Sequence, residues 1–98
     1  MTVNSNDWDI MRIQLHPSLK RFADGQTTLT VDDGTVATLL DAIKMCAPLL
    51  YKNIIDNSGA IRPYVQVYIN QQSYKDCSPT QYLSHKDEID IITSLVGG

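Results

Sequence analysis

The sequence predicts an α+β domain in which a mixed sheet of four to five strands is covered by one main helix. Two observations lead to this prediction. Residues 36–50 place apolar side chains at helical spacing, and four other segments alternate apolar and polar residues with the period of a half-buried strand. A chain of 98 residues has room for one such domain and one modest hydrophobic core.

The first two strands are expected over residues 9–15 and 26–31, where every second residue faces the core. Between them, Asp24 and Gly25 are typical of a turn with positive φ. These two strands therefore form the first half of the sheet.

Thr35 is expected to begin the main helix, because its hydroxyl can accept hydrogen bonds from the free amides of the first turn. Pro48 disfavours helical geometry in the residue before it, so the helix is expected to end near Cys46. The apolar residues that follow the helical period are Val36, Leu39, Leu40, Ile43, Ala47 and Leu50.

The second half of the chain predicts a helical turn over 51–56, a strand over 64–70 and a hairpin into a short strand near 73–74. A helical turn over 79–83 and a last strand over 88–94 follow. Right-handed crossover would lay the later strands beside the first. This order of elements indicates a β-grasp.

The expected organisation is a flexible leader over 1–8, the β-grasp domain over 9–94 and a flexible tail over 95–98. With a net charge of -3 and scattered basic residues, the chain has no stripe for a phosphate backbone, so nucleic-acid binding is not expected. No segment has the length of a membrane span or the form of a signal peptide, which makes the cytoplasm the expected location. Cys46 and Cys77 are expected to be reduced thiols, and no metal site is expected.

The sequence ends with two glycines, Gly97 and Gly98. Glycine has no Cβ, so such a tail is thin and its carboxylate can enter a channel that a larger residue would block. The tail therefore has the form of a substrate.

The order of elements and this ending resemble the ubiquitin-like sulfur carriers of the MoaD/ThiS type, the family of the molybdopterin-synthase small subunit and the thiamine-pathway sulfur carrier. The matching stretches are residues 35–43, 65–70 and 87–92, followed by the double glycine. The resemblance implies that an ATP-dependent adenylating enzyme of the ubiquitin-activating type activates the Gly98 carboxylate. Conversion to a thiocarboxylate would then let the chain donate sulfur to a downstream sulfur-accepting enzyme in a biosynthetic pathway.

In this reading the chain is a carrier and a cosubstrate, not an enzyme. It binds no cofactor itself, since ATP and the sulfur source are used by the partner enzyme. Leu95, Val96 and Gly97 are the expected tail-binding residues. Three side chains are expected to face away from the core and to contact the partner, unless the helix or a loop covers them: Tyr64, Tyr68 and Ile92.

Two other functions share the same sequence features. A ubiquitin-like protein modifier would be conjugated through Gly98 to lysines of other proteins. A non-reactive ubiquitin-like adaptor would not use the tail at all. The sequence leaves open which of these applies, which sulfur acceptor is served, and whether Gly98 is the encoded end or one exposed by a protease.

Overall fold

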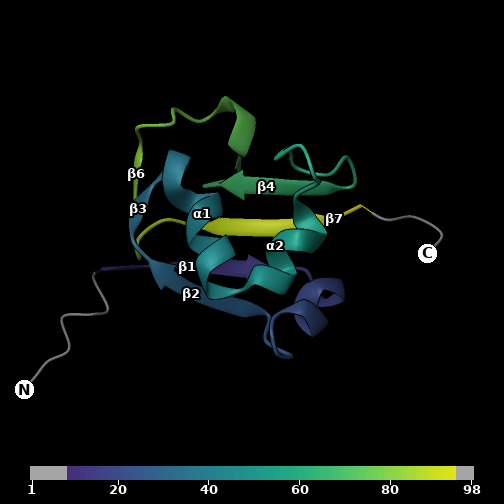
Figure 1. Cartoon of the computed structure of the whole chain (residues 1–98). Coiled ribbons are helices and arrows are strands. Elements are labelled where there is room, and N and C mark those ends of the chain that lie inside the picture. The colour runs from purple at the N-terminus through teal and green to yellow at the C-terminus, as the bar shows by residue number, and fades with distance from the viewer. Residues whose placement is uncertain (1–8, 95–98) are drawn as a thin grey trace, which may run out of the picture.

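A five-stranded mixed sheet forms the centre of the computed structural model, which describes residues 9–94 (Figure 1). The strand order is β2-β1-β7-β4-β5. Strand β7 is parallel to β1 and antiparallel to β4, so the last strand of the chain occupies the middle of the sheet. The predicted α+β class and β-grasp arrangement are confirmed. The strands are β1 (Ile10–Leu15), β2 (Thr28–Asp32), β4 (Val65–Ile69), β5 (Gln72–Ser73) and β7 (Ile89–Thr93).

The first hairpin follows the predicted alternation. Strands β1 and β2 pair antiparallel with Ile13 opposite Leu29, and both side chains are buried. The predicted turn between the strands has positive φ at Asp24 (54°) and Gly25 (80°). A 3-10 helix, η2 (Pro17–Phe22), precedes this turn, where the sequence predicted only a connection.

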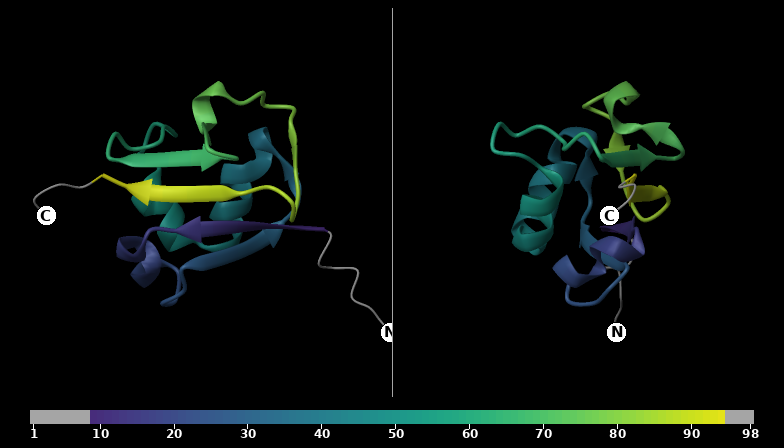
Figure 2. Two further views of the ribbon diagram at one scale, coloured as in Figure 1. Left: turned by 180° about the vertical axis from the view of Figure 1, so that it is seen from behind. Right: turned by 90° about the vertical axis from the view of Figure 1, so that its right-hand side faces the viewer.

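Two α-helices cover one face of the sheet, and no helix of residues 9–94 covers the other (Figure 2). Helix α1 (Val36–Cys46) ends where it was predicted to end. Helix α2 (Pro48–Ile54) begins at the proline itself, so the prediction of a helical turn over 51–56 is wrong in its limits. Proline is well suited to the first turn of a helix, because its missing N–H has no partner to lose there.

The start of α1 is held by a loop from the second half of the chain. Strand β3 (Gly34–Thr35) pairs with β6 (Tyr82–Leu83), so the predicted helical turn over 79–83 is wrong. The amides of Val36 and Ala37 donate to the carbonyl oxygens of Gln81 (2.9 Å) and Pro79 (3.0 Å). The two carbonyl oxygens accept from amides that have no partner within the helix. A helical turn over 79–83 would not place these carbonyl oxygens at the start of α1.

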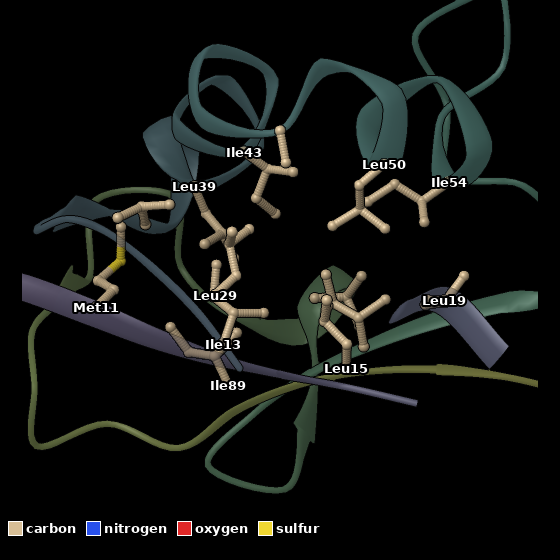
Figure 3. Close-up of a cluster of buried hydrophobic side chains, with 14 of the residues drawn as sticks. Met11, Ile13, Leu15, Leu19, Leu29, Leu39, Ile43, Leu50, Ile54 and Ile89 are labelled. Atoms are coloured by element: carbon tan, nitrogen blue, oxygen red, sulfur yellow. The ribbon is translucent and has the colours of Figure 1, made fainter. Parts of the chain in front are cut away.

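The hydrophobic core lies between the sheet and the two helices (Figure 3). Leu39 and Ile43 from α1 face the inward side chains of β1 and β7, and Leu50 and Ile54 extend the same layer from α2. The predicted apolar stripe is therefore shared by two helices. Leu83 of β6 is fully buried as well. The largest fully buried side chains are Met11, Ile13, Leu39, Ile43, Leu50, Ile54, Ile69, Leu83, Ile89 and Ile91.

A hairpin turn and a short 3-10 helix follow β4. The hairpin from β4 to β5 turns at Asn70 (φ 53°) and Gln71 (φ 69°), as predicted, and η3 (Tyr74–Asp76) follows it. None of the helices within residues 9–94 has the length and hydropathy of a membrane span. The predicted leader over 1–8 and tail over 95–98 lie outside the described residues.

Candidate functional site

The candidate site is the end of β7, where the chain leaves the sheet toward the double glycine. Ile89 and Ile91 of this strand are fully buried, and Thr93 still pairs with Val65 of β4. Beyond the strand, the Ser94 amide donates to the Tyr64 carbonyl oxygen at 2.8 Å. The chain is therefore held in register as far as Ser94, the last described residue.

A chain of hydrogen bonds joins the end of β7 to η2. The hydroxyl oxygens of Thr93 and Ser18 lie 3.0 Å apart, and the Ser18 hydroxyl oxygen lies 2.8 Å from Nδ1 of His16. The His16 amide in turn donates to the Ile91 carbonyl oxygen at 2.8 Å. These contacts hold the end of β7, from which the chain continues toward the double glycine.

Sequence reasoning missed these residues. Ser18 and Thr93 are 75 positions apart, and each on its own is an ordinary polar residue beside an expected strand. The parallel pairing of β1 with β7 is what brings the segment after one strand next to the end of the other. Only that pairing would have identified them.

Two of the predicted partner-contacting residues share the open face of the sheet. Tyr68 lies opposite Asp90, and Ile92 lies opposite Gln66, so Tyr68 and Ile92 are diagonal neighbours on adjacent strands. Both are half-buried, and the Tyr68 hydroxyl donates to Gln66 Oε1 at 2.8 Å. Neither helix lies over this face, which leaves the pair accessible (Figure 2).

Tyr64 does not join this face. It precedes β4 and packs against the core, so the expectation that it points away from the core is wrong. Its ring instead helps to line a shallow hollow beside the end of β7. The hollow is lined by Ser18, Leu19, Arg21, Phe22, Asn53, Tyr64 and Thr93.

The two thiols have backbone partners. Cys46 is exposed and its Sγ donates to the Thr30 carbonyl oxygen at 3.7 Å. Cys77 is half-buried, and its Sγ donates to the Ser73 carbonyl oxygen at 3.4 Å. Within residues 9–94, no three His, Cys, Asp or Glu side chains are grouped as metal ligands.

The remaining residues predicted for the site are Leu95, Val96, Gly97 and Gly98, all outside the described residues. What the structure contributes is their starting point. A central strand with buried neighbours on both sides cannot shift without breaking the core, so the segment after Ser94 begins from a fixed place and direction. Such an arrangement can present a chain segment to another protein.

Comparison with known proteins finds similar structures but no similar sequence. No family model and no curated protein sequence matches the chain. Small archaeal modifier protein 1 (SAMP1) of Haloferax volcanii superposes with a TM-score of 0.72 at 25% identity, over 91% of this chain and 99% of that one. A chain of the BexX/CysO complex of Amycolatopsis orientalis gives 0.72 at 13% identity over 90% and 99% of the two chains.

Urm1 of Trypanosoma brucei superposes with a TM-score of 0.63 at 17% identity, over 94% of this chain and 98% of that one. All three matches span nearly the whole of both chains, so the likeness concerns the entire domain. At these identities it is a likeness of fold. In its fold, the chain is a ubiquitin-like β-grasp protein that resembles the small sulfur carriers and modifiers of the MoaD/ThiS type.

Proposed function

We propose that this chain is a sulfur carrier that reacts at Gly98. The observation that supports the proposal is the position of β7: the central, immobilised strand ends at Thr93, five residues before Gly98. Extended from Ser94, the remaining residues reach about 17 Å. A partner enzyme that grips the domain would thus receive the carboxylate with much of its orientational freedom already removed.

The chemistry takes place in two steps on the partner. A carboxylate oxygen of Gly98 attacks the α-phosphate of ATP, and pyrophosphate leaves as the acyl-adenylate forms. Sulfide then attacks the carbonyl carbon, so that a C–S bond forms and the C–O bond to AMP breaks. The product is a thiocarboxylate, whose sulfur can pass to an acceptor on a downstream enzyme.

The chain itself acts as cosubstrate and supplies two contacts. Leu95, Val96 and Gly97 would occupy the partner's channel, where two adjacent glycines allow the closest approach of the backbone. Tyr68 and Ile92, on the open face, would contact the body of the adenylating enzyme, with Tyr64 at the margin of the exit. The match to a chain of the BexX/CysO complex supports the idea that a protein of this fold works together with a partner.

The test is the intact mass of the protein purified from its own cells, followed by the mass of its C-terminal peptide. A form heavier by the difference between sulfur and oxygen, located at Gly98 and removed by alkylation, is expected. A variant lacking Gly97 and Gly98 serves as the control and should show no such form. The same spectrum also shows whether Gly98 is the last residue of the mature chain.

Conjugation to proteins is the second candidate, and the likeness to a protein named as a modifier, SAMP1, favours it specifically. After the same adenylation, a lysine amine would attack and form an isopeptide bond. Branched peptides joining Gly98 to a foreign lysine would identify this function. Recovery of the free acid alone, after incubation with a cognate adenylating enzyme, ATP and sulfide, would contradict both candidates and favour the adaptor.

A further inference from the structure

The charged residues of this domain are sorted between the two ends of the sheet. Strands β1 and β7 run in one direction and β2 and β4 in the other. The segments after β1 and β7 and those before β2 and β4 therefore meet at the same end, called here the exit end. The segments at the opposite ends of these strands form the far end (Figure 1).

Basic residues gather at the exit end. Lys20 and Arg21, the only adjacent basic pair, are exposed on η2. Arg21 lines the same hollow as Thr93, the last residue of β7. Lys52 precedes Asn53, another residue of that hollow, and Arg62 donates from Nη2 to the Lys52 carbonyl oxygen at 3.0 Å. Four of the eight basic residues thus lie near the start of the tail.

These charges are poorly compensated. Within the described part of the chain, neither Lys20 nor Arg21 forms an ion pair, and the Arg21 guanidinium carbon lies 5.0 Å from the centroid of the neighbouring Phe22 ring. Asp24 and Asp56 are the acidic residues at this end, and Asp56 accepts from the amides of Ser58 and Ala60 and also interacts with the charge of Arg62. The four basic residues at the exit end therefore outnumber the two acidic ones.

The far end carries the opposite charge. Asp9, Asp32 and Asp33 flank the start of β1 and the end of β2, and Asp87 and Glu88 precede β7. The pKa of Tyr82 in β6 is raised, because its hydroxyl donates to Asp33 and the carboxylates of Asp33, Asp9 and Asp87 lie nearby. Lys86 is the basic residue beside Asp87 and Glu88, so acidic residues predominate at the far end and basic residues at the exit end.

We infer that the basic rim formed by Lys20, Arg21, Lys52 and Arg62 docks against an acidic surface around the channel of the adenylating enzyme. This inference rests on the proposed function. A dipole with this orientation turns the tail toward an acidic entrance during the diffusional encounter, and the rim charges then act on the rate of association more than on the chemical step.

The test compares two double variants that change the net charge equally. Lys20→Glu/Arg21→Glu reverses the rim, and Lys44→Glu/Lys86→Glu reverses two exposed lysines outside it, one on α1 and one at the far end. The kcat and KM of ATP–pyrophosphate exchange are measured with the adenylating enzyme of the same genome, at about 50 mM and about 500 mM NaCl.

The rim variant should raise KM about tenfold at low salt and about twofold at high salt, with kcat unchanged. The control pair should change KM less than about twofold. Unfolding midpoints equal to that of the wild type would exclude a folding defect in either variant. Lys20→Gln/Arg21→Gln, which removes the charges without reversing them, should raise KM by a smaller factor.

Three results would overturn the inference, and a fourth would overturn the proposed function on which it rests. Equal effects of the two double variants would mean that only the net charge matters. An unchanged KM for the rim variant, with normal adenylation of the wild type, would refute the rim and leave the proposed function standing. Binding of an RNA oligonucleotide by the wild type but not by the rim variant, with KM unchanged, would assign the basic residues to nucleic acid. Absence of adenylation in the wild type would refute the proposed function itself.

Discussion

Among single residues, Asp56 shows how one side chain can organise a whole turn. Its Oδ1 accepts from the amides of Ser58 (2.8 Å) and Ala60 (3.1 Å) and from the Ser58 hydroxyl (2.6 Å). Gly59, with φ at 89°, allows the backbone to close around the carboxylate. These hydrogen bonds, led by that of the Ser58 hydroxyl, and the charge of Arg62 lower the pKa of Asp56 from 3.8. The loop before β4 is therefore held by an ionised group.

Acid is expected to loosen this turn. Because the folded state lowers the pKa of Asp56, the stabilisation by its carboxylate is complete above the unfolded value of 3.8 and is lost as the pH falls through the folded value. The free energy of unfolding of the wild type should thus exceed that of Asp56→Asn near neutral pH, and the gap should narrow in acid. Denaturant unfolding of both proteins across this range measures the gap. A gap that is constant with pH would show that ionisation of Asp56 does not matter.

Among the elements, the junction of β3 with α1 depends on one close approach. The Thr35 amide donates to Thr38 Oγ1 at 2.9 Å, and that hydroxyl donates to the Thr35 carbonyl oxygen at 3.1 Å. A Cβ added at Gly34 would lie 2.4 Å from Thr38 Oγ1. Glycine at position 34 is therefore required by space and not by an unusual φ.

Substitution of this glycine should be costly only while Thr38 keeps its hydroxyl in place. Gly34→Ala is expected to lower the free energy of unfolding by about 1–2 kcal/mol, because the Thr38 side chain must turn away and lose its hydrogen bonds. In the Thr38→Ala background the same substitution should cost less than about 0.5 kcal/mol, because the obstructing oxygen is absent. A double-mutant cycle measured in urea decides this, and strictly additive effects would contradict the steric explanation.

For the whole molecule, the central position of β7 gives the open face and the tail a common frame. Tyr68 and Ile92 lie on adjacent strands of that face, and Ile92 is the residue before the last of β7. A partner that contacts this pair is therefore placed at a fixed distance from the start of the tail. In the proposed function, this strand would couple recognition of the open face to reaction at Gly98.

Removal of the pair should weaken recognition without altering the reaction. Tyr68→Ala and Ile92→Ser are each expected to raise KM for the adenylating enzyme about tenfold, the effect of losing one well-packed interface residue. The kcat should stay the same, since neither side chain reaches the carboxylate. Tyr82→Ala, which removes a tyrosine that is 57% exposed on β6, is the matched control and should leave KM unchanged. A loss in kcat with KM constant would contradict the assigned role.

Much of the fold could be predicted because the signals were local. The alternation in β1, β2, β4 and β7, the positive φ at Asp24 and Gly25, and the end of α1 before Pro48 each depend on residues adjacent in sequence. The errors occurred where distant partners decided the outcome. Residues 79–83 formed no helical turn, because their carbonyl oxygens and strand β6 are engaged by the start of α1 and by β3. Tyr64 packs against the core and lines a hollow with Leu19 and Phe22 of η2, a segment far away in sequence.

The candidate site divides in the same way. The outward position of Tyr68 and Ile92 follows from the period of a strand, so the sequence alone was enough to predict it. Gly97 and Gly98 were predicted from residue type, and they stay a prediction because they lie outside the described residues. The link between Thr93 and Ser18, and the basic rim at the exit end, required the parallel pairing of β1 with β7.

The sequence by itself determined the class of fold, the core residues and the candidate reacting end, because hydrophobic periodicity and the special geometry of glycine and proline act within a few residues. Tertiary structure alone decided which charges lie near the end of β7 and what holds this strand in place. Pairing between strands brings together residues as distant in sequence as Ile13 and Ile89, and no local property of either residue encodes that contact.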